Sequence, residues 1–338
     1  MKNWKKTGLT ALAGSLVAFT ANAGDMSVSG TANLTYAGNS GAQDIGGNAN
    51  DATGRGADGS RWGMNKSITF SGSGEMDNGW TVSVSQTLKD GSSTGVGMTI
   101  DMGDMGSLNY ESDTGARGVG KIKDMAPTAV EDVGDGLDVD GTATPSGRSG
   151  LVSGGSKGFH YSKALDMVEI GVGYAHKSAA GQANGGHSGS GGKASAVSGF
   201  IKIDPMDGLE IGAGFGEVAN ATTVGQTDDH STYYATYVYG PLTVGYQQSE
   251  LDHYNTGNDE DSISYSALYA INDEMSISYG EAENDKGGTT VDEELSGWSA
   301  SYTMGSMSFT AHRNKGTGMD NAANKESEHT EIGVTFAF

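Results

Sequence analysis

The sequence predicts an all-β protein, a sixteen-stranded antiparallel transmembrane β-barrel, and three observations support this prediction. The first is residues 331–338, where apolar residues alternate strictly with small or polar ones. The second is a series of tight turns that recur at intervals of about 33 residues, which is typical of a structural repeat. The third is an amino-terminal segment with the layout of an export signal.

The final segment of the sequence is predicted to be a strand with one apolar and one water-tolerant face. Its two faces are Ile332, Val334, Phe336 and Phe338 on one side and Glu331, Gly333, Thr335 and Ala337 on the other. A last strand that ends on phenylalanine resembles the closing strand of Gram-negative outer-membrane β-barrels. This segment is therefore expected to lie in a barrel wall, with the aromatic residues towards lipid.

Residues 1–23 are predicted to be a cleaved signal peptide. Lys2, Lys5 and Lys6 precede an apolar core from Leu9 to Phe19, and Ala21-Asn22-Ala23 has the small residues that favour cleavage after Ala23. The apolar core is too short to span a bilayer as a helix. The mature chain, 24–338, is expected to form the barrel.

The composition agrees with an exported barrel and excludes other classes. The chain has 56 Gly, 4 Pro and no Cys, so it contains neither disulfides nor thiolate metal sites. Its formal net charge of −22 argues against a nucleic-acid partner. The polar average is compatible with membrane insertion, because only every second residue of a barrel strand meets lipid.

Alternating strands, tight turns and longer polar loops follow one another along the mature chain. The turns are clearest in the C-terminal third, at Pro205–Gly208, Gly240–Pro241, Asn272–Glu274 and Met304–Ser306. Towards the N-terminus, strands are expected at 26–36, 67–76, 80–89, 98–102 and 108–111, with a loop from Gly38 to Asn65. Seven tight turns and eight longer loops give sixteen strands. The strand 26–36 is expected to pair with 330–338 and close the sheet.

With these features the chain resembles the general porins of Gram-negative outer membranes. The resemblance covers the signal, the sixteen alternating strands, an outsized third loop at 112–156 and the terminal Phe338. It implies that the third loop folds into the lumen and constricts the pore, that three barrels form a homotrimer in outer-membrane lipid, and that basic residues face the loop. The implied function is passive diffusion of ions and small hydrophilic solutes, without catalysis.

Charged residues of the third loop are the candidate pore constriction. Its acids cluster in 131–140, whereas its bases mostly precede them. The candidates on the loop are Glu131, Asp132, Asp135, Asp138, Asp140, Arg117, Lys121 and Lys123, and Lys89 is a candidate on the facing wall. Arg55 and Arg61 are further candidates for the facing wall, but only Lys89 falls on the expected lumen-facing parity. Because acids predominate, we expect a preference for cations.

Several candidate lumen residues lie on the polar faces of the predicted strands. They are Ser83, Ser85, Thr99, Asp101, Asn109, Glu111, His160, Glu169, Lys177, Lys202, Glu210, Gln247, His312 and Glu331. Most of them are expected simply to wet the pore wall. Aromatic residues near strand ends are expected to form girdles at the membrane surfaces.

Some alternatives remain open from the sequence. Asp132, Asp135, Asp138 and Asp140 could hold a structural Ca²⁺, since hard cations bind several carboxylate oxygens, or the loop could simply be an exposed acidic loop. An outer-membrane barrel enzyme that hydrolyses lipid or peptide would need a Ser/His/acid cluster, which the sequence does not place. A secreted Gly/Asp-rich, Ca²⁺-dependent surface protein would predict nonapeptide repeats, and these are absent.

Overall fold

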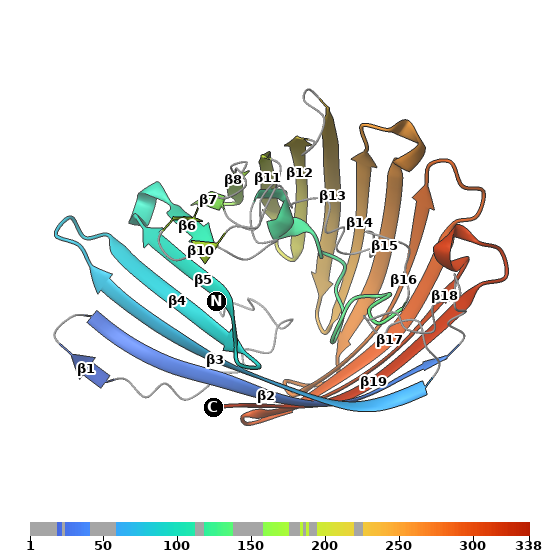
Figure 1. Cartoon of the computed structure of the whole chain (residues 1–338), viewed down its shortest axis with the longest axis horizontal. Coiled ribbons are helices and arrows are strands. Elements are labelled where there is room, and N and C mark those ends of the chain that lie inside the picture. The colour runs from blue at the N-terminus through green and yellow to red at the C-terminus, as the bar shows by residue number, and fades with distance from the viewer. Residues whose placement is uncertain are drawn as a thin grey trace.

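Sixteen antiparallel strands form a closed barrel in the computed structural model of the chain (Figure 1). The structure describes residues 19–21, 24–40, 59–111, 118–137, 158–175, 183–184, 187–188, 195–219 and 226–338. Among these residues, no helix is long and apolar enough to cross a membrane. The only helices in this part of the chain are short 3-10 turns: η1 (Gly103–Met105), η2 (Gly118–Ile122), η4 (Thr256–Asn258) and η5 (Met319–Asn321).

The strands of the wall follow chain order. They are β2 (Gly24–Ser40), β3 (Gly59–Glu75), β4 (Thr81–Lys89), β5 (Ser92–Asp101), β6 (Ser107–Glu111), β7 (Gly158–Leu165), β8 (Val168–Ala175), β11 (Ala196–Met206), β12 (Leu209–Ala219), β13 (Thr227–Tyr239), β14 (Leu242–Asp252), β15 (Glu260–Ala270), β16 (Met275–Lys286), β17 (Glu293–Met304), β18 (Met307–Thr317) and β19 (Glu326–Ala337). Three short strands lie outside the barrel order: β1 (Phe19–Ala21), which pairs with β2, and β9 (Ala183–Asn184), which pairs with β10 (His187–Ser188).

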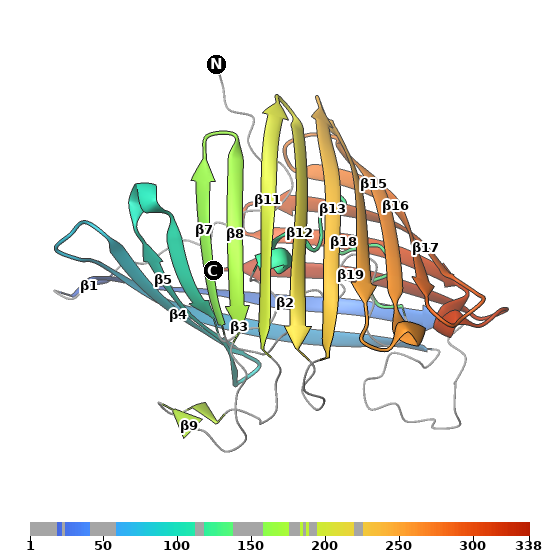
Figure 2. The same cartoon turned by 90° about the horizontal axis from the view of Figure 1, so that it is seen from above.

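Closure of the barrel occurs between its first and last strands, as the sequence predicts. Ala37 of β2 pairs with Glu331 of β19, and the ladder continues to Thr31 opposite Ala337. Beyond it, Phe338 and Gly30 exchange two backbone hydrogen bonds of 2.8 and 3.0 Å. Neighbouring strands from β7 to β13 run side by side in Figure 2, and β8 pairs directly with β11. The sheet therefore has no open edge.

Two boundaries in the N-terminal half differ from the prediction. The predicted loop between the first two strands is shorter, because β3 begins at Gly59 and pairs with β2 as far as Asn39. The sequence between 59 and 66 is rich in polar residues, but it still alternates, with Trp62 and Met64 exposed on the outer face. Further along, β5 begins at Ser92 after a turn at Asp90-Gly91. The longer loop that the sequence predicts between the strands 80–89 and 98–102 is therefore only a tight turn.

The outer face of the wall is apolar and the inner face is polar. Strand β14 shows this plainly: Leu242, Val244 and Tyr246 are exposed on the outside, whereas Gln247 and Ser249 are buried on the inside. Exposed aromatic residues near strand ends agree with the predicted girdles, among them Trp62, Tyr239 and Tyr269, whereas Trp298 lies in the middle of β17. Apolar groups facing outwards are expected of a wall that is solvated by lipid rather than water.

Candidate functional site

A segment of the third loop, Gly118–Leu137, lies inside the barrel against its wall (Figure 1, green). Side chains from six wall strands hydrogen-bond to it along its whole length. The wall residues are His160 (to Gly118 N, 3.1 Å), Ser198 (Val119 N, 3.2 Å), Gln247 (Met125 N, 2.8 Å), Ser266 (Pro127 O, 2.7 Å), Ser278 (Ala129 N, 2.9 Å) and Asn314 (Asp135 O, 2.8 Å). His329 of β19 adds a packing contact with Gly136. The third loop therefore does fold inwards, as predicted.

Gln247 makes the most contacts of these anchors. Its amide nitrogen donates to Ile122 O at 2.7 Å and to Thr232 Oγ1 at 2.9 Å, while its oxygen accepts from Met125 N at 2.8 Å. Only 1% of the residue is exposed. One side chain thus satisfies a buried donor and a buried acceptor of the loop backbone, which could not go unpaired without a penalty.

Two apolar clusters hold the same segment to the wall. Val119 and Ile122, which are fully buried, pack against Phe200 and Tyr234. The second cluster forms at the other end of the segment, where Val133 and Leu137 pack against Ala282, Leu295 and Met319. Apolar side chains buried inside a polar lumen would be costly if the loop swung free, because they would then be exposed to water.

Glycines on the inner wall let the loop approach the backbone of the strands. A Cβ added at Gly245 would lie 2.3 Å from Pro127 Cδ, and one at Gly280 would lie 2.7 Å from Val133. Gly214 lies in the same way beneath Val119. Part of the high glycine content is therefore explained by loop docking rather than by turns.

Carboxylates gather where this loop crosses the lumen. Burial and the neighbouring Asp132 raise the pKa of the Asp124 carboxyl to about 7, although the ammonium group of Lys123 lies 3.1 Å away. Burial and the carboxylates of Asp135, Asp132 and the wall residue Glu331 raise the pKa of Glu131. These groups influence one another because they share a confined region, so the loop presents a concentrated negative field.

The comparisons with known proteins agree with this geometry. A sequence profile of the family described as Gram-negative porin matches residues 8–338. The chain belongs to the Gram-negative porins. The family therefore identifies an outer-membrane channel, and neither the predicted hydrolase alternative nor the secreted surface-protein alternative gains support from it.

Solved porin structures share the fold at low sequence identity. A porin structure refined at 1.8 Å matches with a TM-score of 0.65 at 13% identity, over 93% of this chain and 100% of the other. OmpT of Vibrio cholerae matches with a TM-score of 0.65 at 13% identity, over 95% and 100%. An anion-selective porin from Comamonas acidovorans matches with a TM-score of 0.62 at 13% identity, over 93% and 99%. No curated protein sequence matches the chain significantly.

The basic candidates of this porin are only partly brought to the constriction. Lys123 pairs with Asp124, and Lys121 is exposed on the loop. Lys89 faces the lumen, as predicted, because it pairs with the inward-facing Ser67. Arg61 was a candidate for the facing wall, but the outward parity expected for it was wrong. It also faces the lumen, since it pairs with Ala37, and Ala37 in turn pairs with Glu331.

Other predicted residues have mixed outcomes. His160, Gln247 and His312 are buried on the inner face, in agreement with the prediction. Arg55, Arg117, Asp138, Asp140 and Lys177 lie outside the described residues. The predicted Ca²⁺ site therefore stays a prediction, since only Asp132 and Asp135 of its four ligands can be placed. Sequence reasoning did not single out Asp124, which the folded loop brings near Asp132, or His329 of β19, whose ring lies beside Gly136 of the loop.

Proposed function

We propose that this porin is a water-filled diffusion channel for ions and small hydrophilic solutes, with a moderate preference for cations. The family supports a channel, and a barrel of about sixteen strands is wide enough for an aqueous lumen. The observation that carries the cation preference is the set of loop carboxylates, Asp124, Glu131, Asp132 and Asp135, inside the barrel. This preference belongs to the residues of this chain rather than to the fold.

Proximity decides which charges act on a permeating ion. In an aqueous lumen a charge is screened over about 8–10 Å at physiological ionic strength. The carboxylates of the inward loop act directly on the passing ion, whereas acids on the outer loops and turns are largely screened. We therefore expect the preference to weaken as salt concentration rises.

The fold alone supports either sign of selectivity. A structurally similar porin from Comamonas acidovorans is described as anion-selective, although its chain superimposes over almost its whole length. The difference must then come from the side chains along the lumen. In this chain Lys123 lies beside Asp124, while Glu131 has three carboxylates acting on it, so negative charge dominates on the loop side.

The deciding experiment measures the reversal potential of the purified channel in a planar bilayer under a KCl gradient. Replacing Asp132, Asp135, Asp138 and Asp140 by Asn should move the reversal potential towards zero without abolishing the current. A matched control replaces the same number of aspartates at the short turns, Asp77, Asp166, Asp207 and Asp273, and should leave it unchanged. Anion preference in the wild type, or equal effects of the two quadruple changes, would refute the proposed selectivity.

We also propose a homotrimer, which the resemblance to general porins implies. The support for this is the family alone. Native mass spectrometry of the detergent-solubilised protein should give the mass of three chains, and unheated electrophoresis should show a species that dissociates on boiling. A single-chain mass under both conditions would show a monomeric channel.

A further inference from the structure

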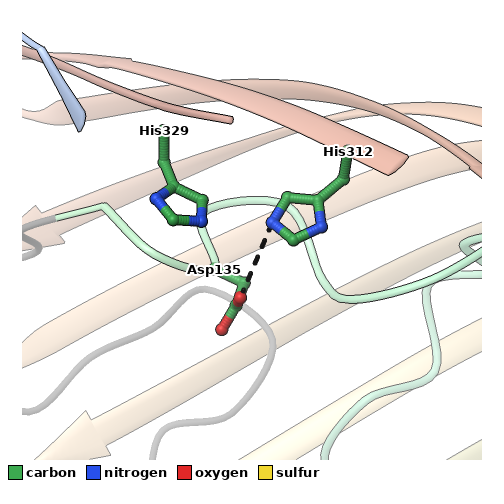
Figure 3. A group of neighbouring side chains, drawn as sticks. All are labelled: Asp135, His312 and His329. Atoms are coloured by element: carbon green, nitrogen blue, oxygen red, sulfur yellow. Dashed lines mark ion pairs between the residues drawn. The ribbon is translucent and has the colours of Figure 1, made fainter. Parts of the chain in front are cut away.

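A cluster of two histidines and one aspartate joins the inward loop to the barrel wall (Figure 3). His312 of β18 and His329 of β19 have ring centroids 5.3 Å apart, and Asp135 of the loop lies beneath them. One ligand atom from each of the three residues lies within 4.8 Å of the other two. The pair joined by the dashed line in Figure 3, His312 Nε2 and Asp135 Oδ2, is 3.8 Å apart.

The histidines are buried and oriented. Only 3% of the His312 side chain and 7% of the His329 side chain are exposed. His312 Nε2 makes no hydrogen bond to any described residue, although it is buried. His329 Nδ1 contacts Asn39 Oδ1. In the tautomer that donates from Nδ1 to this amide oxygen, the lone pair lies on Nε2. This is the arrangement in which a second-shell oxygen orients a metal-binding imidazole.

The aspartate is held in place by the backbone of the loop. Asn314 donates to Asp135 O at 2.8 Å, and the next residue, Gly136, has φ of 76°. A Cβ at Gly136 would lie 2.3 Å from the His329 ring, so glycine is needed for this approach. The Asp135 side chain itself is 48% exposed, which leaves the cluster open to ions from the lumen.

We propose that Asp135, His312 and His329 form a binding site for a transition-metal cation such as Zn²⁺, with Glu331 as an additional ligand. Glu331 Oε2 lies 3.9 Å from His329 Nε2. Two imidazoles with carboxylates suit Zn²⁺, Co²⁺, Ni²⁺ or Cu²⁺, whereas Ca²⁺ takes oxygen ligands. In a tetrahedral Zn²⁺ site the ligand atoms lie about 3.4 Å apart, so the exposed Asp135 side chain and the two imidazole rings would rotate towards one another to bind the ion.

A bound divalent cation would do two things here. It would link β18 and β19 to the inward loop, adding to the hydrogen bond from Asn314. It would also offset the charge of Asp135 and Glu331, two of the carboxylates near the constriction. Metal binding itself does not depend on the proposed cation preference, so the two proposals can fail separately.

The test titrates Zn²⁺ and Co²⁺ into the untagged, chelator-treated barrel in detergent. Calorimetry should give one saturable Zn²⁺ site per chain, and Co²⁺ should give the visible absorption of a tetrahedral site. Changing His312→Gln, His329→Gln or Asp135→Asn should weaken the affinity at least as much as loss of a second-shell partner, about 10- to 100-fold. The control His230→Gln removes a buried imidazole of β13 outside the cluster and should bind normally.

Two Zn²⁺-binding results would overturn the proposal, and a third result would contradict its ligands. One is the absence of saturable Zn²⁺ binding to the wild type; the other is binding that the Asp135→Asn and His312→Gln variants leave unchanged. Heat-modifiable migration in gels verifies that each variant is folded, and Asp135→Asn, on the loop, keeps the test decisive if a wall variant fails to fold. Stronger binding of Ca²⁺ than of Zn²⁺ would likewise contradict the imidazole ligands.

Discussion

Loss of the Gln247 side chain should loosen the inward loop while leaving the barrel intact. The change Gln247→Leu keeps the approximate volume but removes both the donor to Ile122 O and the acceptor for Met125 N. Two backbone groups of the loop then lose their partner at a position where only 1% of the glutamine is exposed. Leucine cannot replace either bond, so the loop backbone must rehydrate or move.

The free energy by which Gln247→Leu destabilises the docked loop can be estimated from the two backbone groups that lose their partner. A buried polar group left unpaired costs about 1–3 kcal/mol, so two such groups cost about 2–6 kcal/mol if no water reaches them. Water from the lumen lowers this figure, and we expect about 2–3 kcal/mol. At about 1.4 kcal/mol per tenfold, local opening of the loop becomes about 30- to 140-fold more frequent. The apolar clusters at both ends of the segment keep it within the barrel.

Hydrogen exchange of the loop amides measures this opening, and single-channel recording measures its effect on the current. The Met125 amide should exchange about 30- to 140-fold faster in Gln247→Leu, and the open-channel current should become noisier. The control is Gln248→Leu on the same strand, whose amide bonds Tyr246 and Glu250 on the outer face. Equal exchange rates in both variants would refute the idea that Gln247 anchors the loop.

Three further predictions concern other parts of the same molecule. Deleting Phe338, whose ring covers Gly30 at the closing seam, should reduce the amount of inserted protein but leave the conductance of assembled channels unchanged; normal insertion would contradict this. Gly245→Val should displace Pro127 and change the single-channel conductance, whereas Gly257→Val, with open space around it, should not. Because the pKa of Asp124 is raised to about 7, its carboxylate gains protons as pH falls from 8 to 6, and cation preference should decline over that range. Asp124→Asn should flatten this part of the pH profile, and an unaltered profile would rule out Asp124 as its source.

The barrel itself could be predicted from the sequence because each wall strand meets two different solvents. Lipid on one side and water on the other impose a period of two, and β19 shows it without exception from Glu331 to Phe338. Short turns such as Asp207-Gly208 then separate the strands, with Gly208 at φ of 80°. The order and closure of the strands follow from these local signals, since every pairing in the wall joins neighbours in the chain apart from the closing pair.

The constriction could be predicted only in outline, because its contacts join residues far apart in the chain. Asp135 and Asn314 are 179 residues apart, and Gln247 and Ile122 are 125 apart. No local pattern marks such pairs. The orientation of Arg61 was misjudged for a related reason: the surrounding residues have the composition of a loop, yet they continue the ladder of β3 with β2.

The docking of the loop explains how selectivity can arise in a chain whose acids are widely distributed. A series of wall side chains hydrogen-bonds to the loop, beginning with His160 on β7 and ending with Asn314 on β18. These bonds hold the loop against one side of the wall. The strands β2 to β6 complete the ring and carry the lumen-facing bases Arg61 and Lys89. A permeating ion therefore passes between carboxylates on the loop and a wall with sparser positive charge. Salt screens the effect of charges that lie more than about 10 Å from the ion. This local asymmetry, and not the net charge of −22, should therefore determine the sign of selectivity.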